Sequence, residues 1–97
     1  MTGQEAFEII RKRKPLVKVR GCLDYGTFYA FCLAPIYVND NEEYFTGTVM
    51  DAVDKKTGRV FMYDISSDID AYERAKNVDI SDVFDTPISE VTKYVGI

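Results

Sequence analysis

The amino-acid sequence predicts a single α+β domain, spanning residues 1–97, built on a four-stranded antiparallel β-meander. An N-terminal helix and one or two C-terminal helices are expected to pack on one face of this sheet. Apolar residues recur at helical spacing near both ends of the chain, and the β-rich middle has connections too short for parallel crossovers. The length of 97 residues and the 46% hydrophobic content are those of one globular domain.

The N-terminal helix is expected over about residues 3–13. Thr2 and Glu5 form a capping-box pattern, in which each side chain bonds the backbone amide of the other residue. The basic residues 11–14 suit the C-terminal end of a helix dipole, and Pro15 stops the helix. The apolar stripe of this helix consists of Ala6, Phe7, Ile9 and Ile10.

Two strands are expected to follow. Residues 17–20 alternate between apolar and basic, which predicts a strand with one solvated face. Residues 27–33 are largely apolar and predict a central strand that is buried on both faces. Asp24, Tyr25 and Gly26 supply the turn between the two strands.

The two cysteines are expected to be reduced thiols. A tight turn at residues 24–26 makes opposing residue numbers sum to about 50. Cys22 then lies opposite Phe28, and Cys32 lies opposite Lys18. Because cysteines on different rungs do not meet the geometry of a disulfide, we expect both side chains to act as small buried hydrophobes.

The most informative segment is 44–65, which predicts two strands joined by a turn at residues 55–58. With a four-residue loop, opposing residue numbers sum to 113. The pairs are Val53 with Val60, Ala52 with Phe61, and Met50 with Tyr63. One face of the hairpin then carries Val49, Asp51, Val53, Val60, Met62 and Asp64. The other face carries Met50, Ala52, Phe61, Tyr63 and Ile65.

Both faces of this hairpin contain apolar residues, although a two-layer domain needs to bury only one. The face with Phe61 and Tyr63 holds no charge, so we expect it to meet the helices. The opposite face is expected to remain uncovered. It forms the candidate protein-interaction surface of Val49, Asp51, Val53, Val60, Met62 and Asp64.

The C-terminal third predicts further helices. Residues 66–68 supply caps for a helix over about residues 68–77, whose acidic start and basic end match the helix dipole. Thr86 followed by Pro87 is a typical helix start, and a short third helix is expected to end near Gly96.

The sequence contains no catalytic or metal-binding motif. It has no histidine, so catalysis would depend on carboxylates, tyrosines or cysteines. Asp64, Asp68 and Asp70 lack the spacing of an EF-hand loop, and we interpret them as a strand end and helix-capping acids. Asp51 and Asp64 are diagonal neighbours on the hairpin and are interpreted as surface residues. We therefore expect a protein that is not an enzyme and that uses no metal or cofactor.

The net charge of −4 is unevenly distributed. Residues 1–20 carry a net charge of +4, and the rest of the chain carries −8. One basic cluster on an acidic body argues against general nucleic-acid binding and favours self-association or docking to another protein. The cluster itself, Arg11, Lys12, Arg13 and Lys14, is explained by the helix end. No apolar run approaches the roughly 20 residues that span a bilayer, and the N-terminus lacks the order of a signal peptide, so we expect a cytoplasmic protein.

Two resemblances add to this interpretation. Residues 51–60 (DAVDKKTGRV) are similar to the V-D-A-x-T-G-x-V hairpin of PepSY-like domains, which follows an Ala-x-x-Ile helix as residues 5–10 (EAFEII) precede the sheet here. That family is largely extracytoplasmic and implicated in protease inhibition. The whole chain, with GCLDYGTFYAFCLAP at 21–35 and DIDAYERAK after the hairpin, resembles small uncharacterised proteins of phages and prophages of Firmicutes. This second resemblance implies an accessory or virion-associated role.

The leading hypothesis is a small non-enzymatic protein-binding or assembly module that acts through the exposed face or edge of its sheet. Its partner would be a second copy of the chain, giving a homo-oligomer, or another protein. The alternative hypothesis is a PepSY-like protease inhibitor or peptide-binding domain.

Overall fold

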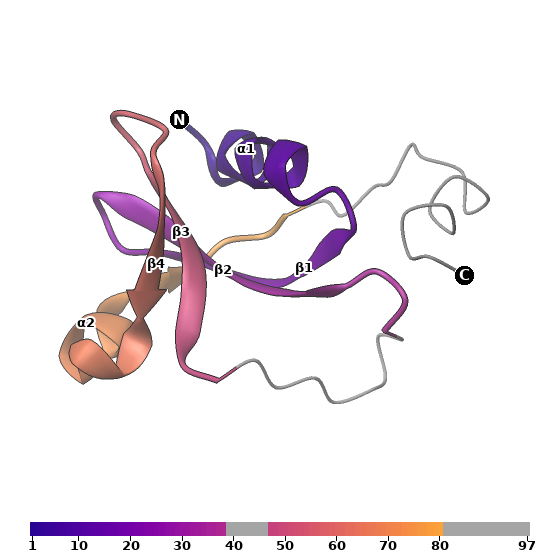
Figure 1. Ribbon diagram of the computed structural model, residues 1–97. Helices are drawn as coiled ribbons and strands as arrows, with labels where there is room; N and C mark the ends of the chain where they lie inside the picture. The colour runs from indigo at the N-terminus through magenta and orange to yellow at the C-terminus, as the bar shows by residue number, and fades with distance from the viewer. Residues whose placement is uncertain (39–46, 81–97) are drawn as a thin grey trace.

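The computed structural model describes residues 1–38 and 47–80 of the chain. Its elements are α1 (Gly3–Arg13), β1 (Val17–Asp24), β2 (Phe28–Pro35), β3 (Val49–Asp54), β4 (Val60–Asp64), η1 (Ile65–Ser67), α2 (Ile69–Arg74) and β5 (Lys76–Asn77). The five strands form one antiparallel sheet in the order β4-β3-β2-β1-β5, with α1 above the sheet and α2 below its lower left end (Figure 1). The α+β class is confirmed. The expected third helix lies outside the described residues.

Helix α1 begins and ends where the sequence predicts. The Thr2 hydroxyl accepts from the Glu5 amide at 3.2 Å, and the Glu5 carboxylate accepts from the Thr2 amide at 3.0 Å, which completes the capping box. Basic side chains occupy its last turn, where they oppose the negative end of the helix dipole.

The β1–β2 hairpin has the expected turn but a different register. Tyr25 donates its amide to the carbonyl of Phe28 at 3.0 Å, so the turn is centred between Gly26 and Thr27 rather than on Tyr25. Cys22 therefore lies opposite Phe31 rather than Phe28, and Cys32 lies opposite Gly21 rather than Lys18. Alternation along the strands points the two cysteines to opposite faces, and both are free thiols.

The β3–β4 hairpin has the predicted register. Val53 pairs with Val60, and Met50 pairs with Tyr63. Asp54 closes the turn, because its carboxylate accepts from the amides of Lys56 and Thr57 at 2.8 Å each. Gly58 supplies the positive φ of +73° that this loop requires.

Helix α1 packs on the opposite face of this hairpin from the one expected. Ala6, Phe7 and Ile10 are buried against a set of sheet residues that includes Val53, which is 0% exposed. The sheet members of this core are Cys22, Tyr29, Phe31, Leu33 and Val53, with Val60 partly buried beside them. We call their side of the sheet the α1 face. The expectation that Val53 and Val60 would remain uncovered is wrong.

Two contacts explain the reversal. The central strand β2 places Tyr29 directly beside Val53, and its Phe31 ring lies 6.0 Å from the Phe7 ring of α1. The acid that made this face look unsuitable, Asp51, is paired with Lys14 from the end of α1 at 2.6 Å. The helix therefore brings both the apolar partner and the compensating charge.

The second face of the sheet carries a cluster of four half-buried aromatic rings, which we call the aromatic face. Tyr25 stacks on Phe28 at 4.8 Å between ring centroids, and Tyr63 lies 4.9 Å from Phe28. Phe61 meets Phe28 edge to face at 5.3 Å. Offset and edge-to-face pairs of this kind stabilise each other beyond their burial, so this face is closed partly by its own side chains.

The C-terminal part of the described chain differs from the single helix expected at 68–77. Asp68 caps α2 by accepting from the Ala71 amide at 3.0 Å, as predicted for this acid. The helix ends at Arg74 because Ala75 is extended, and the next two residues pair with β1 as β5. Helix α2 also lies on the other side of the sheet from α1, so the helices do not share one face (Figure 1).

Candidate protein-interaction surface

The structure divides the six predicted surface residues into two groups. Val53 is fully buried and Val60 is partly buried under α1, so neither forms part of a surface. Val49 is 42% exposed and Met62 is 59% exposed. Together with Asp51 and Asp64 they form what we call the β3–β4 patch, which lies on the α1 face beyond the end of the helix.

The end of α1 makes the patch a shallow hollow rather than a flat surface. Lys14 follows the last residue of α1, and its ammonium group reaches Asp51 at 2.6 Å. A hollow of about 300 Å³ opens beside this ion pair, with apolar walls from Leu33, Val49 and Met62. An adjoining hollow of about 250 Å³ is lined by Arg13, Val60 and Met62, among others. The patch is thus apolar at its base and charged at its rim.

The patch borders an open sheet edge, because β4 has one neighbouring strand among those the structure describes. The Ile65 amide donates to the Thr48 carbonyl, and the Arg59 carbonyl accepts from Asp54, so odd-numbered residues of this stretch bond towards β3. The amides and carbonyls of Val60, Met62 and Asp64 therefore point away from the sheet. Within the described part of the chain, the amides and carbonyls of Val60 and Met62 are open to another strand, whereas the Asp64 carbonyl already accepts from the Ser67 hydroxyl at 2.7 Å.

The two long edges of the sheet differ in their protection. Natural sheets block edge pairing with lysine, proline, bulges or very short strands. The β1 edge has a bulge between Val19 and Gly21, and it is partly covered by the two-residue strand β5, which contains Lys76. Strand β4 has the sequence VFMYD, with no lysine, proline or bulge, and its one charged side chain, Asp64, is at its end. The open edge at β4 is thus less protected against pairing with another chain than the β1 edge.

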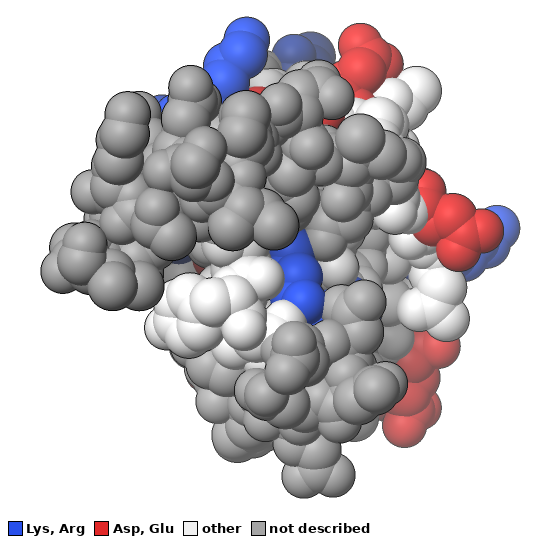
Figure 2. All heavy atoms as spheres, turned by 90° about the vertical axis from the view of Figure 1, so that its right-hand side faces the viewer, with Lys and Arg blue, Asp and Glu red and all other residues white. Residues whose placement is uncertain are grey.

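Charge is distributed asymmetrically around this edge. Asp64 is exposed, and hydrogen bonds from the Ser66 hydroxyl and then the Thr48 hydroxyl hold its pKa below the ordinary value, so it is ionised at neutral pH. The basic last turn of α1 lies over the other end of β4. On the side of the molecule away from β4, Lys and Arg side chains show at the top and at the centre, and Asp and Glu side chains show at the top and along the right-hand margin (Figure 2).

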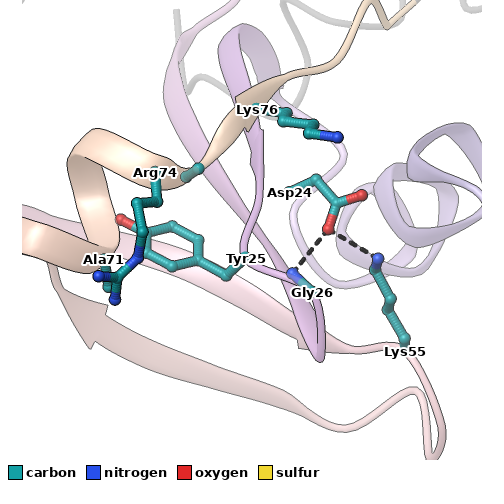
Figure 3. Close-up of a pocket in the computed structure, with 8 residues that line it drawn as sticks. Asp24, Tyr25, Gly26, Lys55, Ala71, Arg74 and Lys76 are labelled. Carbon is teal, nitrogen blue, oxygen red and sulfur yellow. Dashed lines mark hydrogen bonds and ion pairs between the residues drawn. The ribbon is translucent and has the colours of Figure 1, made fainter.

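A third hollow, of about 350 Å³, lies between the β1–β2 turn and α2 (Figure 3). Lys55 bonds Asp24 at 2.7 Å, and this hydrogen bond lowers the pKa of the Asp24 carboxyl. Lys76 extends towards Asp24, whereas Arg74 lies beside the Tyr25 ring on the side away from Asp24 (Figure 3). Lys55 and Lys76 thus face Asp24, and Arg74 does not. The sequence did not predict this hollow, because only the fold brings the β1–β2 turn beside Lys55 and the end of α2.

The other sequence-derived candidates have structural roles. Arg11 lies 3.8 Å from Glu8 and 5.0 Å above the Phe7 ring, which agrees with the interpretation of the basic run as a helix end. Burial raises the pKa of the Cys22 thiol to about 12, so this cysteine is a poor nucleophile at neutral pH. The described residues contain no group of three or more side chains arranged to hold a metal ion.

Comparison with known proteins does not assign the chain to a family. No protein-family model matches the chain, and searches of curated proteins and of solved structures gave no significant match. The resemblances to PepSY-like domains and to phage and prophage proteins therefore stay predictions. Within the described residues, no helix is long and apolar enough to cross a membrane.

Proposed function

We propose that this chain is a non-enzymatic protein-binding or assembly module that accepts a strand of another polypeptide at the β4 edge. The observation that supports this most directly is the outward-pointing backbone of Val60, Met62 and Asp64 on a strand with no lysine, proline or bulge. Main-chain hydrogen bonds to such an edge supply affinity, and pockets for alternate side chains supply specificity. The exposed Met62 side chain, which borders the hollow beside Val49, would supply an apolar contact for such a strand.

The proposal accounts for two of the exposed apolar side chains, Val49 and Met62. Val49 and Met62 lie on the same two strands and border one hollow, so a strand added beside β4 would cover Met62 and extend the α1 face over it. Hydrophobic groups that are exposed together beside an edge are typical of interaction sites rather than of a solvated surface.

An assembly role in a phage or prophage, in the cytoplasm of the host cell or in the virion, is one setting for this module and forms part of the proposal. The alternative is a PepSY-like inhibitor or peptide-binding domain. The open edge favours that alternative as well, since an extended segment of a protease or peptide would dock there by the same main-chain bonds.

Peptide selection tests the proposed function. Linear peptides are selected from a random library against the folded chain, and their binding is mapped by shifts of backbone amide resonances. We expect the largest shifts at Val60, Met62 and Asp64, with smaller shifts at the inward-facing Phe61 and Tyr63. Peptides that instead shift residues of α2 or the aromatic face would contradict the proposal, as would a chain that binds neither peptides nor itself.

A further inference from the structure

We infer that the partner at the β4 edge is a second copy of this chain, paired antiparallel through β4 with Met62 on the two-fold axis. The inference rests on the proposed function and names the partner and the register. A two-fold interface uses the same surface on both copies, so it requires a strand that is complementary to itself. The hydrogen-bonding pattern and the side chains of β4 both meet this requirement.

The direction of the backbone groups selects the register. Only even-numbered residues of β4 point outward, so a partner strand must oppose even to even. Centring the pair on Met62 places Val60 opposite Asp64 of the second copy and uses all three outward residues of both strands. A shift by one residue sets outward groups against inward ones, and a shift by two leaves one residue of each strand without an opposite in β4. The register centred on Met62 is therefore the one that gives each outward residue an opposite in β4. The Asp64 amide bonds between the copies, since the Asp64 carbonyl already accepts from the Ser67 hydroxyl at 2.7 Å.

The side chains on the aromatic face match in this register. Phe61 lies opposite Tyr63 of the second copy, as a non-hydrogen-bonded pair, in which side chains approach closely. Both residues already belong to the aromatic cluster around Phe28. The two clusters would join into one across the two-fold axis.

Charges on the α1 face also match. Asp64 of the second copy lies opposite Val60, and Val60 shares its hollow with Arg13 from the basic end of α1. The contact occurs twice because of the two-fold symmetry. Each copy thus presents an acidic strand end to the basic helix end of the other, although the chain as a whole carries a net charge of −4. This complementarity favours a second copy over an unrelated strand.

A proline substitution tests the inference without disturbing the monomer. The Met62 amide points away from β3, so Met62→Pro removes a bond needed between copies and none within the hairpin. Met62→Val keeps the amide and an apolar side chain and serves as the matched control. By sedimentation equilibrium we expect wild type and Met62→Val to dimerise, and Met62→Pro to associate at least about tenfold more weakly with an unchanged circular dichroism spectrum.

Two results would overturn the inference. One is a wild-type chain that remains monomeric up to about 1 mM, and the other is a Met62→Pro variant that dimerises like wild type. If selected peptides bind at β4 while the wild-type chain stays monomeric, the inference fails and the proposed function stands. If neither peptides nor a second copy binds, both fail.

A charge exchange tests the register. We expect Arg13→Glu and Asp64→Lys each to weaken the dimer by about threefold, and the double variant to recover most of this loss. The recovery separates a contact between these residues from a general effect of net charge. A double variant weaker than either single variant would exclude the register centred on Met62.

Discussion

At the scale of single residues, Asp51 shows how a charged side chain can lie on a core face. It alternates with Val49 and Val53, so in the sequence it makes this face of the hairpin look like a surface. In the structure its partner is Lys14, which follows the last residue of the helix that covers the face. The apolar contacts of α1 bury this side of the hairpin, and Lys14 offsets the charge that Asp51 brings to it.

Paired substitutions to aspartate test this assignment of faces. Val53 is fully buried, so Val53→Asp places an unpaired carboxylate in the core, and we expect it to lower the free energy of unfolding by at least about 3 kcal/mol. At a protein concentration too low for association, Met62→Asp on the same face is expected to cost no more than about 1 kcal/mol, because the side chain is 59% exposed and only the charge of Asp51 opposite opposes the change. Urea denaturation measures both. Equal losses would contradict the assignment.

Asp54 should contribute to the acid sensitivity of the fold. Hydrogen bonds from the Thr57 amide and then the Lys56 amide hold its pKa below the ordinary value of 3.8. The ionised form therefore stabilises the folded state above pH 3.8, and this contribution is lost as the pH falls through the lower folded-state pKa. Asp54→Asn keeps an acceptor but does not titrate.

We expect the urea midpoint of wild type to fall more steeply below pH 3.8 than that of Asp54→Asn. Parallel declines in the two proteins would show that this carboxylate has no part in the acid response.

At the scale of elements, the features set by neighbouring residues, namely helix ends and one hairpin register, were predicted correctly. The capping box and basic end delimit α1, and the turn at 55–58 sets the register of β3 and β4. The predicted register of β1 and β2 was wrong because the Tyr25 amide bonds the Phe28 carbonyl, which centres the turn between Gly26 and Thr27. The helix predicted over residues 68–77 was too long. Lys76 continues the helical spacing of the sequence, but in the fold it pairs with Asp24 of β1. Pairing with a distant segment is not visible in local patterns.

The capping box of α1 gives a prediction at this scale. Thr2→Ala removes the acceptor of the Glu5 amide, and we expect a loss of about 0.5–2 kcal/mol in the free energy of unfolding. Thr2→Ser keeps the hydroxyl and should stay close to wild type. Thermal unfolding followed by circular dichroism compares the three proteins. Indistinguishable alanine and serine variants would mean that the cap does not limit the stability of α1.

At the scale of the whole molecule, the sequence predicted the α+β class but not the properties that define the site. The split of the six surface candidates follows from where α1 ends, since Val53 lies under the helix and Met62 lies beyond it. The open edge follows from the strand order, which places β4 last. Both depend on the assembled sheet. The sequence therefore predicted the strands and register of the six candidates, but not which of them α1 covers.

The central claim is that β4 ends the sheet of one copy and pairs there with a second copy. Amide hydrogen exchange at low and high protein concentration tests it most directly, residue by residue. We predict that exchange at Val60, Met62 and Asp64 slows together as the concentration rises, while the inward-facing amides of Phe61 and Tyr63 keep the protection that β3 gives them at every concentration. Exchange at the three outward amides that does not depend on concentration would contradict the claim.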